Sequence, residues 1–402
     1  MSPAARAGPP GAGRTPSALL RERRVVVCLG SGGVGKTTIS AALALQGARL
    51  GRRVLVLTID PARRLADALG LEGGLGSEPR RLPPALLARL GVPPEGELSA
   101  LMLDMKSTFD DLVARFARSD AERERILRNP LYQHVSDALA GSAEYSAMEK
   151  VYQLSESKDL DLIVVDTPPA QHAIDFLEAP ERLLEFLESP VVRLLLHPAL
   201  AAGRTGFRLF QRGTARVLQL LERVSGLAFL QDISEFLLAF EGMSEGFRAR
   251  ARTVKALLEG PQSAYVLATG PGPESTAQGA ALADRLAQGG VTLSGLVANR
   301  VRLWPGPAPT ARAYSPEGEA ALAAALAAAH GARFPARDAA RAALALARGY
   351  AALVERDASA LEPLASRVRA RGGFVVAVPE FERDVHDLGG LAAIADRLGE
   401  VA

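Results

Sequence analysis

The residues with the clearest chemical use lie together in one glycine-rich stretch, GSGGVGKTT. It satisfies the pattern G-x-x-x-x-G-K-[ST], in which glycines allow backbone N–H groups to approach a dense anion closely. Lys36 would place a positive charge between the terminal phosphates of a nucleotide, and the Thr37 hydroxyl could bind Mg²⁺. The predicted phosphate-binding residues are Gly30, Ser31, Gly32, Gly33, Val34, Gly35, Lys36, Thr37 and Thr38.

Two aspartates come directly after apolar runs and are candidates for metal binding or catalysis beside such a loop. Asp166 follows the run LIVV, where a carboxylate at the end of a strand can hold Mg²⁺, usually through water. The alternative for Asp166 is a turn before proline. Asp60 follows the run VLVLTI and precedes Pro61. It could orient an attacking water, but an aspartate before proline is also typical of a helix start, so the residues alone leave both roles open.

The elements that would hold these residues follow from the apolar pattern. Residues 24–29 (RVVVCL) are apolar on both faces, which predicts a buried strand. Residues 36–50 have helical spacing and residues 54–59 form a second apolar run, which together predict a parallel, right-handed βαβ unit. The pattern indicates an α/β fold, with a doubly wound, mainly parallel sheet and helices on both faces. Further strands are predicted at residues 101–103, 162–165, 264–268, 293–298 and 374–378.

The predicted organisation is a disordered tail at residues 1–22 and one domain at residues 23–402, with helical insertions at about 79–158 and 180–259. In the second insertion, apolar side chains share one helix face, and arginines recur four residues apart on another stretch. The apolar face either packs internally or receives a partner, and the arginines form a solvated face or contact an acidic partner or anionic lipid. The two groups are Phe229, Ile233, Phe236, Leu237 and Phe240, and Arg204, Arg208, Arg212 and Arg216.

Composition excludes several other classes of protein. The chain is 48% hydrophobic and 23% charged, which argues against wholesale disorder. Its net charge of +2 gives no nucleic-acid footprint. The single cysteine, Cys28, excludes a disulfide framework, a zinc ribbon and a trithiolate metalloid site within one chain. The sequence contains no uninterrupted run of about 18 apolar residues, the length that a transmembrane helix needs, so we expect a soluble cytoplasmic protein.

Four segments in this order carry a resemblance to a known family. The phosphate loop, residues 58–62 (TIDPA), residues 166–172 (DTPPAQH) and residues 297–300 (VANR) together resemble the ArsA family. This family comprises anion-pump ATPases and tail-anchored-protein targeting ATPases, within the dimeric class that includes MinD and the nitrogenase iron protein. The resemblance covers roughly residues 24–400 and includes the helical insertions. The combination and order of the motifs is more specific than any one of them.

The resemblance implies roles for individual residues and a pair of ligands, ATP and Mg²⁺. Asp60 would open switch I and position the hydrolytic water. Asp166 would open switch II and help hold Mg²⁺, with His172 in the same switch. Asn299 would hydrogen-bond the adenine, and Pro379 would lie near the base. No N/T-K-x-D guanine-reading motif follows a late strand, which agrees with ATP rather than GTP.

Three departures from the family pattern qualify this expectation. Ser31 stands where the family often carries a lysine that reaches across the dimer to the partner's phosphates. Three alternatives follow: an arginine takes the place of this lysine, this chain pairs with a paralogue that carries the lysine, or ATP turnover is slow. Removal of such a cation can lower the rate by about 10³-fold or more. The metalloid-binding cysteines are missing and Cys28 is predicted to be core, which argues against an arsenite thiol site. The targeting groove of the family's eukaryotic members is rich in methionine, whereas the second insertion contains one methionine, Met243. Leucine and phenylalanine would therefore have to line any client groove.

The leading hypothesis is an ATP-dependent dimeric switch enzyme in which Lys36 and Asp60 are catalytic. The dimer would be a homodimer or a heterodimer with a paralogous ATPase, because one chain has a single phosphate loop. The helical insertion would report the nucleotide state to a hydrophobic client or a membrane-protein partner. The alternative is a weakly or non-hydrolysing regulatory subunit of a heterodimer. A MinD-like membrane-surface ATPase is third, because the C-terminal residues 391–402 are short and have little basic character.

Overall fold

The fold is built on one sheet of eight strands in the order β3-β4-β2-β5-β1-β6-β7-β8. The computed structural model describes residues 14–60, 64–117, 119–129, 143–168, 178–179, 181, 185, 245–246, 248–331, 333–382, 385 and 387–400. Every strand pair is parallel except β3 with β4. The strands are β1 (Val25–Gly30), β2 (Arg53–Thr58), β3 (Arg80–Arg81), β4 (Glu97–Met102), β5 (Leu162–Asp166), β6 (Ser263–Thr269), β7 (Leu293–Val301) and β8 (Phe374–Pro379). The predicted α/β class with a mainly parallel sheet is confirmed.

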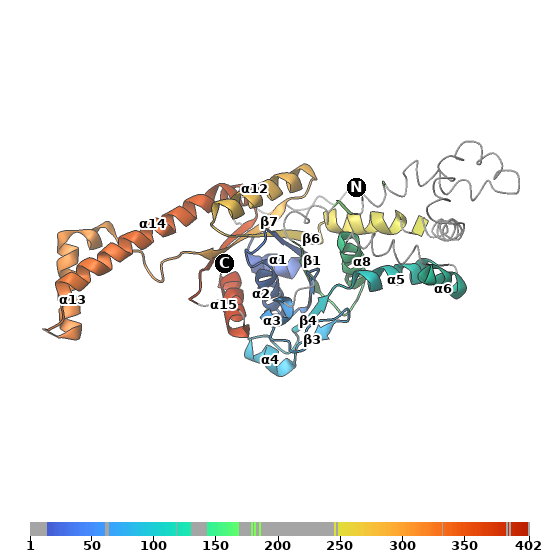
Figure 1. Ribbon diagram of the computed structural model, residues 1–402, viewed down its shortest axis with the longest axis horizontal. Coiled ribbons are helices and arrows are strands. Elements are labelled where there is room, and N and C mark those ends of the chain that lie inside the picture. The colour runs from blue at the N-terminus through green and yellow to red at the C-terminus, as the bar shows by residue number, and fades with distance from the viewer. Residues whose placement is uncertain are drawn as a thin grey trace, which may run out of the picture.

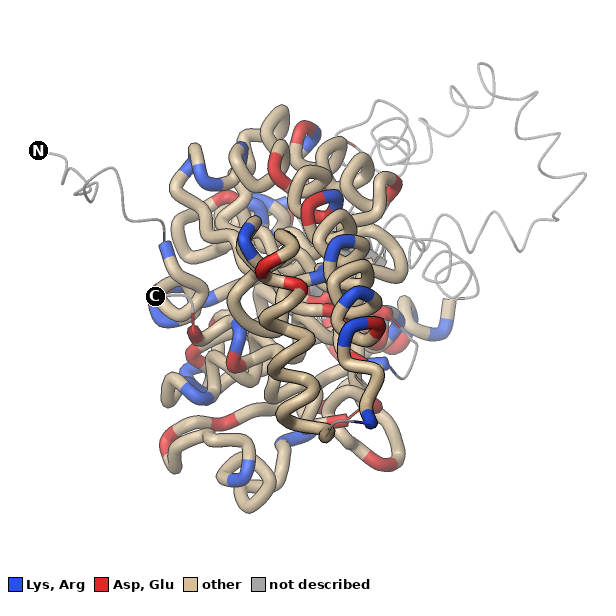
Figure 2. Tube along the Cα trace, turned by 90° about the vertical axis from the view of Figure 1, so that its left-hand side faces the viewer, with Lys and Arg blue, Asp and Glu red and all other residues tan. Residues whose placement is uncertain are grey.

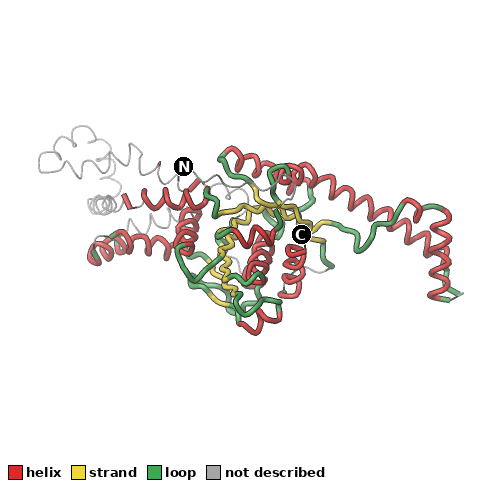
Figure 3. Tube along the Cα trace, turned by 180° about the vertical axis from the view of Figure 1, so that it is seen from behind, coloured by secondary structure: helices red, strands yellow, loops and turns green. Residues whose placement is uncertain are grey.

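Alternate residues of the central strands face two separate hydrophobic layers, which explains why these strands are apolar throughout. In β1, Val26 and Cys28 face one layer, while Val25, Val27 and Leu29 face the other. Helices cover both layers, so the sheet lies in the middle of the molecule (Figures 1 and 3). The first layer is covered by α1 (Pro16–Glu22), α2 (Lys36–Arg49), α3 (Arg64–Ala68), α4 (Pro84–Arg89) and α15 (Leu388–Glu400).

The second layer is covered by helices from three parts of the chain. They are α5 (Met105–Phe116), α6 (Asp120–Arg128), α8 (Ala143–Ser155), a helix over residues 248–259, α12 (Pro273–Gln288) and the C-terminal part of α14 (Ala336–Arg369). A buried ion pair joins two of them: Arg250 Nη2 lies 2.7 Å from Glu149 Oε1, and the two side chains are 8% and 0% exposed. Because α8 leads into β5, this pair connects residues 248–259 to the strand that ends in Asp166.

A helical arm projects from the sheet domain (Figures 1 and 3). It consists of η1 (Ala311–Tyr314), α13 (Pro316–His330) and the N-terminal part of the 34-residue helix α14. At its root, Arg302 binds buried Asp357 and Trp304 packs edge-on against Tyr350, with ring centroids 5.2 Å apart. Further out, α13 packs against α14, and Leu346 of α14 is 74% exposed. Basic and acidic residues are interspersed on the side shown in Figure 2, in agreement with the small net charge.

The structure corrects the predicted tail and extends one strand. Residues 16–22 form α1, because Thr15 caps the helix, Pro16 occupies its first turn, and Leu19 and Leu20 are fully buried. Residues 1–13 lie outside the described residues. The strand predicted at 101–103 begins at Glu97 and pairs with β2 along its whole length, so the first insertion contributes to the sheet itself.

Most of the second predicted insertion lies outside the described residues, including its apolar group and its arginine group. Its end is described as the helix over residues 248–259. Within the described parts of the chain, no helix is both long enough and apolar enough to cross a membrane.

Candidate active site

The glycine-rich stretch forms the turn between the central strand β1 and helix α2. Gly30 is the last residue of β1 and Lys36 the first of α2. A side chain at Gly30 would place its Cβ 2.5 Å from the Ala268 carbonyl oxygen, so only glycine fits between β1 and β6 here. Gly35 has φ +84°, and a Cβ there would lie 2.4 Å from Nδ2 of Asn299. Both glycines are therefore required by the path of the loop.

Helix α2 directs its free N–H groups toward the loop. No side chain caps its N-terminus, and its first turn contains no acidic residue. The unpaired N–H groups and the positive end of the helix dipole make such a terminus suitable for an anion. Eleven of its residues are buried, including Thr37 and Ile39, so the helix is fixed in position by the core.

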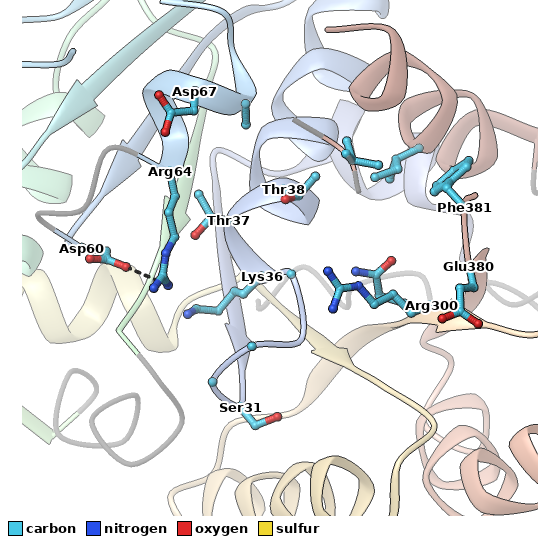
Figure 4. A pocket seen from close by; sticks show the side chains of 17 residues that line it. Ser31, Lys36, Thr37, Thr38, Asp60, Arg64, Asp67, Arg300, Glu380 and Phe381 are labelled. Atoms are coloured by element: carbon cyan, nitrogen blue, oxygen red, sulfur yellow. Dashed lines mark hydrogen bonds and ion pairs between the residues drawn. The ribbon is translucent and has the colours of Figure 1, made fainter. Parts of the chain in front are cut away.

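A pocket of about 610 Å³ opens at the loop and the start of α2 (Figure 4). The predicted residues that line it are Ser31, Gly32, Gly33, Gly35, Lys36, Thr37, Thr38, Asp60 and Asn299. The predicted residues Gly30, Val34, Asp166 and Pro379 are not in its lining. The pocket is also lined by residues that were not predicted to belong to the site, namely Arg64, Asp67, Ala68, Arg300, Glu380, Phe381, Val385 and Ile394.

Asp166 is the buried carboxylate of the site. It is fully buried and accepts hydrogen bonds from the hydroxyls of Thr37 at 2.8 Å, Thr58 at 3.0 Å and Ser40 at 3.3 Å. Burial raises the pKa of Asp166, and the charge of Lys36 and the three hydroxyls counteract this rise. The sheet register explains the meeting, because Asp166 on β5 is level with Thr58 on β2.

The donor set of this cluster fits Mg²⁺. Thr37 offers a hydroxyl oxygen and Asp166 a carboxylate oxygen, and the hydrogen bond between them shows that both can reach one point. Mg²⁺ prefers such hard oxygen ligands and is usually held by one or two protein groups together with phosphates and waters. Among the described residues no cluster of three or more histidine, cysteine, aspartate or glutamate side chains could replace this pair.

Asp60 lies at the rim of the pocket, two residues beyond the end of β2. Its backbone N–H donates to the Thr58 hydroxyl at 3.2 Å, which ties it to the Asp166 cluster. Its carboxylate accepts from Arg64 Nη1 at 3.4 Å, and the two side chains are 28% and 71% exposed. A carboxylate with this access to the pocket can accept a hydrogen bond from a water molecule.

Asn299 supports the loop from behind. The side chain, 6% exposed, donates from Nδ2 to the Val34 carbonyl oxygen at 2.8 Å. The next residue, Arg300, has φ +58°, the one positive φ among the described non-glycine residues. The pairing of β7 with β8 shifts at this point, and the Arg300 side chain enters the pocket near Glu380 and Phe381 (Figure 4). On the β8 side, the pocket is lined by Glu380 and Phe381, which directly follow Pro379, and not by Pro379 itself.

Two further predicted positions are buried. Ser31 is 4% exposed, and its Oγ has no hydrogen-bond partner. Cys28 is fully buried, and burial raises its thiol pKa to about 12, so the thiol is protonated at neutral pH. His172 lies outside the described residues.

Comparison with known proteins shows which family the chain resembles. A family profile described as anion-transporting ATPase matches residues 23–254, which is more than half of the chain. Similar proteins include the fungal protein ATPase GET3 of Chaetomium globosum, 32% identical over 165 residues, and ATPase get3 of Aspergillus terreus, 34% identical over 152 residues. The matched segments cover 40% and 38% of this chain, and 44% and 41% of those proteins. The chain thus spans less than half the length of these relatives.

Proposed function

Because the chain belongs to the anion-transporting ATPase family, we propose that it binds ATP with Mg²⁺, hydrolyses ATP and acts as a dimeric switch. The observation that carries the proposal is a pocket lined by the phosphate loop, in which Thr37 is hydrogen-bonded to buried Asp166. Backbone N–H groups of the loop and α2, together with Lys36, would hold the β- and γ-phosphates. Thr37 and Asp166 would hold Mg²⁺, which when bound neutralises part of the triphosphate charge.

Hydrolysis would take place at the rim that carries Asp60. The Asp60 carboxylate accepts a hydrogen bond from the attacking water and orients it toward the γ-phosphorus. Lys36 stabilises the negative charge that develops on the phosphoryl oxygens. Asp166 keeps Thr37 in position through the 2.8 Å hydrogen bond and links this group to Thr58, two residues before Asp60.

The dimeric part of the proposal rests on family membership and on the single phosphate loop of the chain. The subunits of a homodimer, or of a heterodimer with a paralogous ATPase, would close on ATP and reopen after hydrolysis. The second insertion would then expose or hide a surface for a hydrophobic client or membrane-protein partner. The Arg250–Glu149 pair supports such coupling, because it joins the end of this insertion to the helix that leads into the Asp166 strand.

Two variants test the enzymatic part of the proposal. Lys36→Ala removes a charge-assisted contact and should weaken ATP binding by about 10- to 100-fold and abolish turnover. Asp60→Asn should retain ATP binding and lose hydrolysis by about 10²-fold or more. Binding is measured by calorimetry and turnover by phosphate release, with Arg89→Ala on the exposed face of α4 as the control. Unchanged turnover in Asp60→Asn would remove Asp60 from the mechanism.

Ser31 favours a second candidate function, that of a regulatory subunit. Such a chain would bind ATP, stabilise a heterodimer and leave hydrolysis to a paralogue that carries lysine at the Ser31 position. Phosphate release by the pure chain, with and without such a paralogue, separates the two functions. Substantial turnover by the pure chain would dismiss the regulatory role.

A further inference from the structure

The phosphate loop lacks a second positive charge, because Ser31 stands where the family often carries a lysine. Cleavage of a terminal phosphoryl group is accelerated by a cation close to the oxygens on which charge develops, in addition to a loop lysine. Ser31 brings no charge to the loop, and its hydroxyl is buried. Among the described residues that line the pocket, the basic side chains are Lys36, Arg64 and Arg300.

The two arginines lie on different sides of the pocket. Figure 4 shows Arg300 near Glu380 and Phe381, whereas Arg64 extends from α3 toward Asp60. Asp60 is the residue proposed to orient the water, so Arg64 is the arginine on the side where the γ-phosphoryl group would be attacked. The sequence expectation that an arginine substitutes for the absent lysine therefore has a specific candidate.

The contact between Arg64 and Asp60 is weak and can be exchanged for a contact with a ligand. Arg64 Nη1 lies 3.4 Å from Oδ2 of Asp60, and the Arg64 side chain is 71% exposed. An exposed ion pair at this distance contributes little to stability. A triphosphate carries several negative charges, so it would attract the guanidinium more strongly than one carboxylate does. Arg64 is thus able to move from Asp60 to the nucleotide without disturbing the core.

We propose that Arg64 acts in cis as the catalytic arginine of ATP hydrolysis, in place of the lysine absent at Ser31; this rests on the proposed function. When ATP enters, the guanidinium leaves Asp60 and donates hydrogen bonds to the γ-phosphoryl oxygens, and the Asp60 carboxylate accepts a hydrogen bond from the attacking water. The water oxygen forms a bond to the γ-phosphorus, and the bond from phosphorus to the β–γ bridging oxygen breaks. Its electron pair stays on ADP, and both water protons leave with the phosphate as H₂PO₄⁻.

The test measures turnover and binding separately in the full chain. Arg64→Ala should lower kcat by about 10²- to 10³-fold while ATP affinity changes by no more than about threefold, because on ATP binding the guanidinium exchanges its contact with Asp60 for one with the γ-phosphoryl group, and only the second contact strengthens in the transition state. Arg64→Lys should recover only a small part of the rate, because an ammonium cannot contact two oxygens as a guanidinium fork does. Arg89→Ala, an exposed arginine on α4 outside the pocket lining, serves as the matched control.

Chemical rescue distinguishes catalysis from a structural role. Guanidinium ion at millimolar concentration should restore part of the turnover of Arg64→Ala and leave that of Arg89→Ala unchanged. A kcat of Arg64→Ala within about threefold of the parent rate would overturn the inference and leave the proposed ATPase intact. No turnover in the unmodified chain, alone or with a lysine-bearing paralogue, would instead overturn the proposed hydrolysis, and the role of Arg64 with it.

Mixing of variants tests whether the arginine acts within its own subunit. Arg64→Ala chains are combined with Lys36→Ala chains, whose own sites should be inactive. If Arg64 acts in cis, the mixture hydrolyses ATP no faster than the sum of the separate chains. Recovery of turnover in the mixture would show that Arg64 reaches a partner's site, and would contradict the assignment in cis.

Discussion

Replacement of Asn299 by alanine perturbs the phosphate loop without touching any residue of the loop itself. Asn299 Nδ2 donates to the Val34 carbonyl oxygen at 2.8 Å, and both residues are buried, at 6% and 5% exposed. The same Nδ2 lies 2.4 Å from where a Cβ on Gly35 would be, so the amide fills the space behind the loop. The Asn299→Ala chain lacks this donor, and the Val34 carbonyl loses its side-chain partner.

The size of the effect follows from that one hydrogen bond. A buried acceptor left without its partner costs about 1–3 kcal/mol. If the loop must adopt its observed conformation to bind phosphates, this cost appears in the binding free energy. Since about 1.4 kcal/mol corresponds to a tenfold change, nucleotide affinity should fall by about 5- to 150-fold. The melting temperature should fall by only a few degrees, because Asn299 lies near the C-terminal end of β7 and the apolar side chains of the sheet are unchanged.

Calorimetry with two ligands separates this role from a direct contact with adenine. Mg²⁺–ATP and Mg²⁺–tripolyphosphate, which has no base, are titrated into the parent chain and into Asn299→Ala. If Asn299 acts through the loop, both affinities fall by the same factor; if it acts on the base, only that of ATP falls. Gln278→Ala, on the exposed face of α12, is the control. Tripolyphosphate affinity within about twofold of the parent value, in a folded variant, would refute the reasoning.

Three further predictions concern stability. Glu149→Gln leaves Arg250 buried without its principal counter-charge and should lower the free energy of unfolding in urea by about 3–5 kcal/mol; an unchanged midpoint would contradict this. Hydrogen bonds from Arg53 lower the pKa of Asp161 to about 2, below its value of about 3.9 in unfolded chains. Asp161→Asn should therefore be less stable than the parent at pH 7, and the difference should disappear as pH falls from about 4 to about 2. Gly295→Ala would place a Cβ 2.2 Å from a ring atom on β8 and should destabilise the chain by about 1–3 kcal/mol in thermal melts.

The sequence predicted the central strands because parallel strands covered on both faces are apolar throughout. It did less well at the edge of the sheet. In β4, Glu97 and Ser99 interrupt the apolar run, so the apolar pattern predicts a strand only at residues 101–103, whereas β4 spans Glu97–Met102. Strand β3 consists of two exposed arginines whose pairing depends on residues 99–100, so local sequence contains no signal for it. Thr15 followed by Pro16 is typical of a helix start and indicated α1, but the glycine and proline residues around it favoured a disordered tail.

The phosphate loop was predictable because its chemistry is local, whereas the rest of the pocket depends on tertiary structure. Thr58 meets Asp166 only because β2 lies beside β5 in the sheet. Ser40 had a usable signal, since it follows Thr37 by three positions on α2 and so shares its face. Arg64 and Phe381 reach the pocket from segments far apart in the chain, and no spacing rule connects them. The roles of Asp60, Asn299 and Pro379 stay predictions.

The central claim is that the turn between β1 and α2 binds the phosphates of a nucleotide. Isothermal titration of the full chain with ATP or ADP, in the presence of Mg²⁺, tests this most directly. We predict saturable binding of one nucleotide per chain to the parent protein, and strongly weakened binding to Lys36→Ala. Folded parent protein that takes up neither nucleotide, or a Lys36→Ala chain that binds as tightly as the parent, would contradict the claim.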